Sequence, residues 1–130
     1  SNPPPFIPLG LDALVGTASS NGNCVQLTTA TNTQLGCAWD SQQQDMTQTF
    51  EKVFVLNFGN NNGGAEGICM VYHSNNPPIC GGGGQEIGIG TVPNTFIIEF
   101  DTWQNVGIGD PTQDHVAVNL SSNLLAIRSP

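Results

Sequence analysis

Side chains that could hold a metal ion gather between residues 99 and 115. Two carboxylates, Glu99 and Asp101, lie two residues apart in a run that continues to Trp103. In an extended chain, successive side chains alternate between faces, so both carboxylates share one face. Like charges at that spacing repel each other unless a cation or a proton lies between them. Because unpaired charge inside an apolar strand is costly, this stretch predicts a metal site and not a solvated acidic turn.

The candidate metal ligands divide into two sets by chemical hardness. Calcium prefers several oxygen ligands, including carboxylates, amides and backbone carbonyls. The oxygen donors here are Asp101, the backbone carbonyl of Trp103, Asn105 and Asp110. A transition ion such as manganese or zinc accepts imidazole together with carboxylates. The donors of that kind are Glu99, Asp101, Asp110 and His115. Asp101 and Asp110 would bridge the two ions, so this stretch predicts two adjacent metal sites.

Alternating apolar residues predict the strands that hold these ligands. The expected strands are residues 14–18, 24–28, 36–39, 47–58, 67–73 and 94–98, followed by one that begins at His115. Within the strand that leads to the ligands, Phe96, Ile98 and Phe100 point away from the carboxylates and are expected in the core. No segment has sustained helical periodicity, and turns of Ser, Asn and Gly separate the strands. The sequence therefore predicts an all-β fold, an antiparallel two-sheet jelly-roll sandwich.

Length and charge restrict the classes of protein that fit. The 130 residues allow one domain, expected over residues 11–130, after a proline-rich lead or linker at residues 1–10. Two Lys and Arg against ten Asp and Glu give a net charge of −8, which argues against nucleic-acid and anionic-membrane surfaces. No apolar run approaches the roughly 18 residues of a membrane span. No cationic, apolar signal segment opens the chain, so any secretion signal is expected to have been removed.

The four cysteines fall into two local pairs, each flanking a turn-rich segment. The simplest of the three possible connectivities joins Cys24 to Cys37 and Cys69 to Cys80. A zinc site is the alternative, but the chain lacks the CxxC spacing usual for one. Two disulfides predict an oxidising, extracytoplasmic location, either secreted or on the cell surface.

The ligand stretch resembles a known motif. Glu-x-Asp-x-aromatic-x-Asn, with an Asp five residues on and a His five after that, resembles the manganese and calcium motif of the legume (L-type) lectins, which are concanavalin A-like jelly rolls. The resemblance assigns Glu99, Asp101, Asp110 and His115 to the transition-metal site. It assigns Asp101, the Trp103 carbonyl, Asn105 and Asp110 to the calcium site. It extends more weakly over residues 12–20, 24–27, 47–58 and 64–100.

The same resemblance implies carbohydrate binding without catalysis. Sugars present hydroxyls, which need polar partners, and apolar C–H faces, which stack on aromatic rings. By resemblance, Asn105 supplies the amide and Trp103 the stacking ring. One glycine of the run 81–84, with Gly82 and Gly83 as the candidates, supplies a backbone donor.

The chain departs from the family pattern at Glu66, where the Ala-Asp-Gly turn reads Ala-Glu-Gly. The added methylene moves the carboxylate by about 1 Å, a distance to which binding geometry is sensitive. Glu66 is expected to contact sugar hydroxyls, and the alternative is an exposed loop carboxylate without that role. The alternative keeps open a second function, an adhesion or structural module with metals but no sugar affinity.

A third reading is a hydrolase of the β-glucanase kind, which shares the jelly roll. Those enzymes alternate three acidic residues on one strand, because retaining hydrolysis needs a nucleophile and an acid/base. Here the third acidic position is Trp103, and Glu99 and Asp101 are assigned to metal, so the sequence disfavours an enzyme.

The chain also predicts a partner. Only a short stretch follows the strand that begins at His115, and a half sandwich would leave apolar faces and strand edges open. We therefore expect the N-terminal part of a lectin domain: one chain of a cleaved two-chain lectin, a fragment or a shortened chain. It would be completed by a complementary segment from a second chain or by homo-oligomer pairing. Asn119 begins a glycosylation sequon, but it lies in an apolar strand pattern that disfavours its occupancy.

Overall fold

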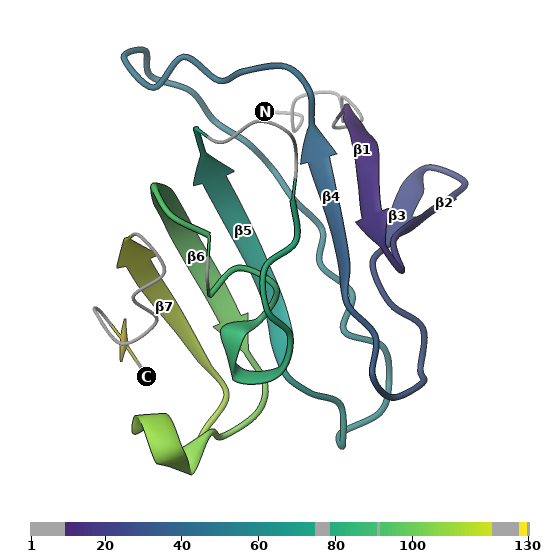
Figure 1. The fold of residues 1–130 in the computed structure, drawn as a ribbon, viewed down its shortest axis with the longest axis vertical. Helices are drawn as coiled ribbons and strands as arrows, with labels where there is room; N and C mark the ends of the chain where they lie inside the picture. The colour runs from purple at the N-terminus through teal and green to yellow at the C-terminus, as the bar shows by residue number, and fades with distance from the viewer. Residues whose placement is uncertain (1–9, 75–78, 91, 121–127, 130) are drawn as a thin grey trace, which may run out of the picture.

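The computed structural model describes residues 10–74, 79–90, 92–120 and 128–129. These residues form antiparallel strands, two short 3-10 helices and no α-helix (Figure 1). The strands are β1 (Leu11–Gly16), β2 (Ser19–Asn21), β3 (Cys24–Gln26), β4 (Gly36–Asp40), β5 (Gly67–His73), β6 (Thr95–Asp101), β7 (His115–Leu120) and β8 (Arg128–Ser129). The helices are η1 (Gly84–Glu86) and η2 (Val106–Ile108). Within these residues, no helix is long and apolar enough to cross a membrane.

The largest sheet has the strand order β5-β6-β7-β8. Strand β6 lies at its centre and pairs with β5 from Thr95 to Asp101 and with β7 from Phe96 to Asp101. β1 and β4 form a separate antiparallel pair, and β2 and β3 form a third. The all-β prediction is confirmed, and the expected strand at residues 67–73 coincides with β5. β1, β3 and β4 overlap the three short strands expected before it.

The two faces of β6 differ in burial. Thr95, Ile97, Glu99 and Asp101 are buried, whereas the intervening residues are half-buried. Ile97 is fully buried beneath apolar side chains of the connection between β5 and β6, chiefly Ile79, Ile87, Ile89 and Val92. The face that carries the carboxylates is therefore the better buried one, contrary to the expectation that Phe96, Ile98 and Phe100 form the core. The described part of the β5–β6 connection packs against the Ile97 face, which explains the burial of that face.

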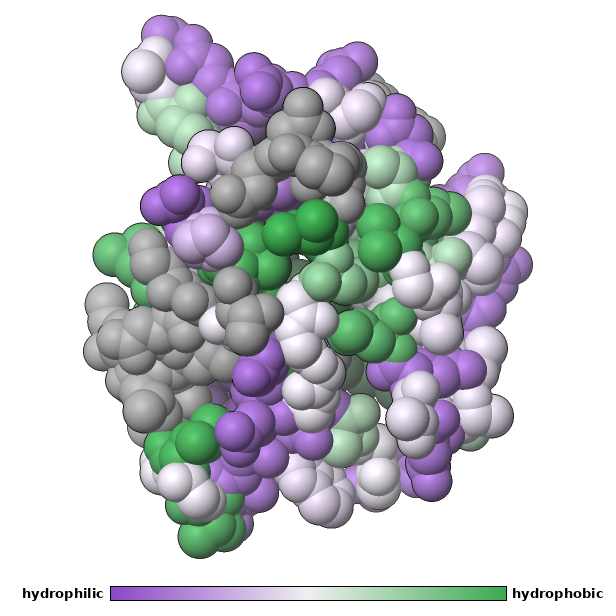
Figure 2. Space-filling model, in the orientation of Figure 1, coloured by the Kyte–Doolittle hydropathy of each residue, from purple (hydrophilic) through white to green (hydrophobic). Residues whose placement is uncertain are grey.

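The predicted long strand at residues 47–58 is wrong. This segment has no strand pairing, and within the described residues no backbone–backbone hydrogen bond involves residues 49–58. Its apolar side chains are exposed, to 55% at Val53 and 81% at Val55. The alternating pattern suits a strand, but a strand also needs a neighbour for its amides and carbonyls. Figure 2 shows further apolar residues exposed on this face of the molecule, among them a patch over β1 and β4.

The predicted disulfides are also wrong. The structure joins Cys37 on β4 to Cys80 after β5, with 5.9 Å between their Cα atoms, and leaves Cys24 and Cys69 as free thiols. The indole Nε1 of Trp39 donates to the Ile79 carbonyl at 3.0 Å, which brings β4 against the chain next to Cys80. Cys24 is exposed in the β2–β3 pair. The Cys69 thiol instead donates to the carbonyl of Ile87, at 3.7 Å. The pairing of Cys37 with Cys80 therefore depends on contacts between segments that are distant in the sequence.

Peptide mapping under non-reducing conditions should recover one linked pair, Cys37 with Cys80. Cys24 should alkylate fast because it is exposed. Cys69 should alkylate slowly, because burial and then the nearby charges of Glu99 and Asp101 raise the pKa of its thiol.

Cys37→Ser should lower the free energy of unfolding by about 4 kcal/mol, the loop-closure estimate for a separation of 43 residues. Cys24→Ser is the matched control and should leave it almost unchanged. Recovery of a Cys24–Cys37 peptide would contradict the structure.

Candidate metal centre

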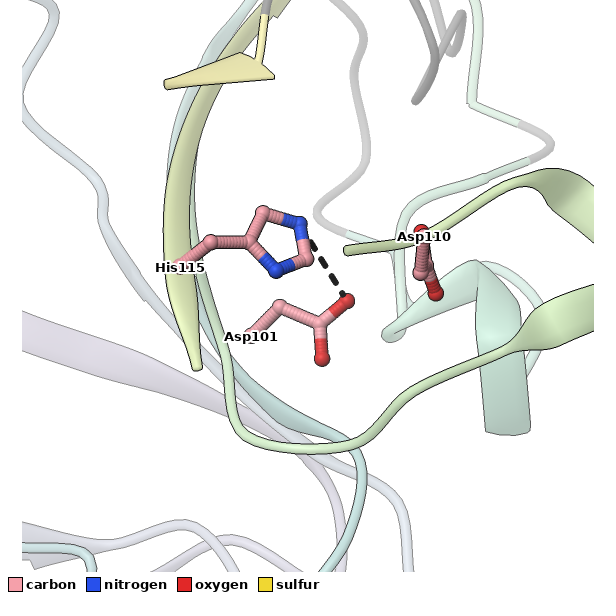
Figure 3. Close-up of side chains that lie close together, drawn as sticks. All are labelled: Asp101, Asp110 and His115. Carbon is pink, nitrogen blue, oxygen red and sulfur yellow. Dashed lines mark ion pairs between the residues drawn. The ribbon is translucent and has the colours of Figure 1, made fainter. Parts of the chain in front are cut away.

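Three predicted ligands converge at the end of the large sheet. They lie where residues 102–114, the loop between β6 and β7 that we call the ligand loop, join the two strands. Asp101 ends β6, His115 begins β7, and the antiparallel register places these two residues opposite each other. Asp110 follows η2 in the loop between them. All three are buried, and one ligand atom from each lies within 4.8 Å of the other two (Figure 3). Such a convergence of two carboxylates and an imidazole provides the donor types that a transition ion accepts.

Backbone amides orient both carboxylates. Oδ1 of Asp101 accepts a hydrogen bond from the Trp103 amide at 2.8 Å, and Oδ2 of Asp110 accepts one from the Asn105 amide at 2.8 Å. The loop residues that carry the predicted sugar contacts are therefore tied to the same side chains as the candidate metal centre. A change that displaces either carboxylate would also displace Trp103 and Asn105.

The ring of His115 is oriented for metal binding. Its Nδ1 lies 3.3 Å from the carbonyl oxygen of Gln113, and its Nε2 lies 3.8 Å from Oδ2 of Asp101 (Figure 3). A proton on Nδ1 would donate to that carbonyl and leave the Nε2 lone pair directed at the carboxylate. Metal-bound histidines commonly have this arrangement, in which the second ring nitrogen donates to a carbonyl or carboxylate.

Glu99 lies on the same face of β6 but outside the group of three. It is 2% exposed, and its Oε2 accepts a hydrogen bond of 2.9 Å from Nδ2 of Asn119 on β7. Three carboxyl groups, those of Glu99, Asp101 and Asp110, are thus buried, and the last two lie beside the imidazole of His115. Burial of negative charge is costly unless cations or donors compensate it. This donor set fits a divalent cation.

Glu66 is placed beside the ligand loop. Its backbone carbonyl accepts hydrogen bonds from Thr102, at 2.9 Å from the amide nitrogen and 3.4 Å from Oγ1. Its side chain is not an exposed loop carboxylate, because Oε2 is buried and has no hydrogen-bond partner. A buried polar atom without a partner is unfavourable and uncommon, and it indicates a missing ion, water or ligand.

The remaining predicted contacts lie on two different loops. Trp103 is 48% exposed and Asn105 half-buried, both in the loop between β6 and β7. Gly82 and Gly83 precede η1 in the connection between β5 and β6. The Gly82 carbonyl accepts a hydrogen bond from Gly88, and a Cβ added at Gly82 would clash with the Glu86 carboxylate. Figure 1 shows η1 near the end of β6 from which the ligand loop departs.

Asn119 was not predicted to contact a candidate ligand. It was considered only as a glycosylation acceptor, yet the structure buries it completely against Glu99. The available signal was its spacing, since residues 115, 117 and 119 of a strand share one face. An asparagine on the face of a ligand histidine is a candidate partner for a ligand.

Comparison with known families identifies the class of protein. The family model of the legume lectin domain matches residues 11–125. This chain belongs to the legume lectin domain family. Its fold is accordingly the jelly-roll sandwich of that family, as the sequence predicted. Legume lectins are carbohydrate-binding, non-catalytic and typically extracellular proteins that generally bind calcium and manganese.

Loss of one central ligand should abolish tight metal binding. We expect Asp101→Asn to weaken Mn²⁺ and Ca²⁺ binding by at least about 100-fold, beyond the range seen for residues that only support a ligand. The matched control is Asp114→Asn, which removes an exposed carboxylate from the same loop. Isothermal titration calorimetry of the metal-free chain would measure both variants. Equal affinities in Asp101→Asn and the unaltered chain would exclude Asp101 as a ligand.

Proposed function

We propose that this chain is a metal-dependent, sugar-binding lectin module without catalytic activity. The observation that carries the proposal is the buried group of Asp101, Asp110 and His115, whose carboxylates also hold the loop bearing Trp103 and Asn105. A transition ion, manganese or zinc, would be held by Glu99, Asp101, Asp110 and His115. Calcium would be held by Asp101, Asp110, Asn105 and the Trp103 carbonyl. When bound, the ions would neutralise the buried carboxylates and restrict the motion of the loop.

The side chains around this loop suit a sugar. The half-exposed indole of Trp103 offers an aromatic face for the C–H groups of a pyranose ring. The amide of Asn105 can both donate to and accept from hydroxyls, and calcium bound at its oxygen would fix which end does so. Gly82 or Gly83 would add a backbone donor from the neighbouring loop.

Glu66 completes the proposed sugar site. Its carbonyl is bonded to Thr102, directly after the ligand Asp101, so the residue is adjacent to the loop. Its buried Oε2 has no partner in the protein, and a sugar hydroxyl would supply the missing donor. The longer side chain is therefore compatible with the role that the shorter aspartate has in the family.

The same residues argue against hydrolysis. A retaining glycosidase needs two carboxyl groups that flank the scissile bond from one open face. Here Glu99 is buried and bonded to Asn119, and Asp101 lies beside His115. The next position along the face is Trp103. The disulfide between Cys37 and Cys80 supports a secreted or cell-surface location, since disulfides persist in oxidising compartments.

Sugar binding should require metal. We expect calorimetric titration with a panel of mono- and oligosaccharides to give heat in the metal-loaded chain and none after chelation. Trp103→Ala should abolish the sugar heat while leaving the Mn²⁺ affinity within about threefold, because its ring is exposed and only its backbone serves the metal.

Val106→Ala, which shortens an exposed side chain of the same loop, is the control and should retain sugar binding. Metal binding without heat from any sugar would instead favour the adhesion or structural module.

We further propose that residues 47–58 pair with a β-strand from a complementary segment. Two observations support this: the segment carries a row of apolar side chains at Phe50, Phe54, Leu56 and Phe58, and residues 49–58 form no backbone–backbone hydrogen bond within the described chain. A strand beside it would satisfy these groups and cover its apolar side chains. Because each copy of the chain carries a net charge of −8, a less acidic partner suits this surface better than a second copy.

The isolated chain should be monomeric by light scattering, with fast amide exchange over residues 49–58. Val55→Glu should change its unfolding free energy by less than about 0.5 kcal/mol, as is usual for an exposed position. Ile97→Ala, at a fully buried position, should cost about 2–5 kcal/mol. A dimer that Val55→Glu dissociates would identify a second copy as the partner and overturn the proposal of a separate segment.

A further inference from the structure

We infer that Asn119 is a positioning residue of the metal centre, which holds the carboxylate of Glu99 and so sets the selectivity between a transition ion and calcium. This inference rests on the proposed metal-binding function. It begins from the strand register, in which Glu99 is opposite Ala117 and Asn119 is opposite Ile97. Asn119 and His115 are therefore the two diagonal neighbours of Glu99 on β7.

The small side chain opposite Glu99 leaves room for its carboxylate to contact either diagonal neighbour on β7. Ala117 is buried and has only a methyl group, so Glu99 can extend along β7 in either direction. Toward His115 lies the group of candidate ligands, and toward Asn119 lies a fully buried amide. The bond of 2.9 Å from Nδ2 to Oε2 shows that the amide holds the carboxylate at one oxygen. The position of Glu99 is thus fixed from the side away from His115 and the other candidate ligands.

The chemistry of asparagine suits this task. Its amide donates a hydrogen bond to the carboxylate without adding a positive charge, so the negative charge of Glu99 stays available to a cation. Lysine or arginine at the same place would neutralise that charge and compete with the metal. Asn119 therefore supports a ligand without replacing the ion.

Loss of the Asn119 side chain should lower the affinities for Mn²⁺ and Ca²⁺ to different extents. Glu99 is a candidate ligand of the transition ion only, whereas Asp101 and Asp110 serve both sites. Displacing Glu99 should therefore weaken Mn²⁺ more than Ca²⁺. A merely structural defect would weaken both ions together, since both depend on the same loop and strand ends.

The burial of Asn119 has a second consequence. A glycan acceptor must be accessible, and this side chain is 0% exposed and bonded to Glu99. The sequon that begins at Asn119 is therefore not a modification site in the folded chain.

The test compares Mn²⁺ and Ca²⁺ affinities by calorimetry in Asn119→Ala and Asn119→Leu, neither of which can donate to Glu99. Both variants should lose about 10–100-fold in Mn²⁺ affinity, the usual range for a partner of a ligand, and less than about threefold in Ca²⁺ affinity. The electron paramagnetic resonance spectrum of bound Mn²⁺ should change as well, because the ligand environment changes. Thermal unfolding of the metal-free variants would show whether they still fold.

A reciprocal variant keeps the inference falsifiable if a single substitution unfolds the chain. Asn119→Asp combined with Glu99→Gln restores a donor and an acceptor, but moves the carboxylate from β6 to β7. We expect this double variant to recover the thermal stability of the metal-free chain without recovering Mn²⁺ affinity. Equal losses for Mn²⁺ and Ca²⁺ in the single variants, or full recovery of Mn²⁺ affinity in the double variant, would overturn the positioning role.

These results separate the inference from the proposed function. Tight Mn²⁺ binding that Asn119→Leu leaves unchanged would overturn the role of Asn119 alone. Failure of the unaltered chain to bind Mn²⁺ would overturn both the metal-dependent function and the inference.

Discussion

The constraint on which this structure depends is the burial of several carboxyl groups on one face of β6 and in the loop that follows it. Glu99, Asp101 and Asp110 are removed from water in a chain that has two basic residues in 130. Such burial is tolerated only where donors or cations compensate it. The protein supplies donors from two directions, the backbone amides of the ligand loop and the side-chain amide of Asn119, and the imidazole of His115 lies beside Asp101. Divalent ions are suited to compensate the rest of the negative charge on these carboxylates.

The arrangement of the fold follows from which face of β6 is covered. The connection between β5 and β6 lies over Ile97 and shields the carboxylate face from water. At the end of the sheet, Phe100 of β6 and Val116 of β7 line an open hollow together with Phe58, and Asp101 and His115 line it as well. The acidic face thus gains a low-polarity surrounding that strengthens its electrostatic interactions, while the opposite face retains apolar surface.

Much of the candidate site was predictable because its determinants are local in sequence. The alternation of Glu99 and Asp101 places both on one face of any extended chain, and His115 follows at the start of the next apolar run. Strand β5 coincides with its apolar run for the same reason. The family motif lies within one stretch of 17 residues, from position 99 to position 115, so no knowledge of distant contacts was needed to recognise it.

Tertiary structure alone decided the features that depend on neighbours in space. Cys37 pairs with Cys80 because Trp39 brings β4 against the chain after β5, a contact that residue spacing does not encode. Residues 47–58 carry a strand pattern, but hydrogen bonding to an adjacent strand makes a strand, and none of the described residues provides one. Asn119 acquires its role only through register with β6. Spacing along the chain determines which face of a strand a side chain occupies. Which residue that side chain then contacts depends on which segments pack together.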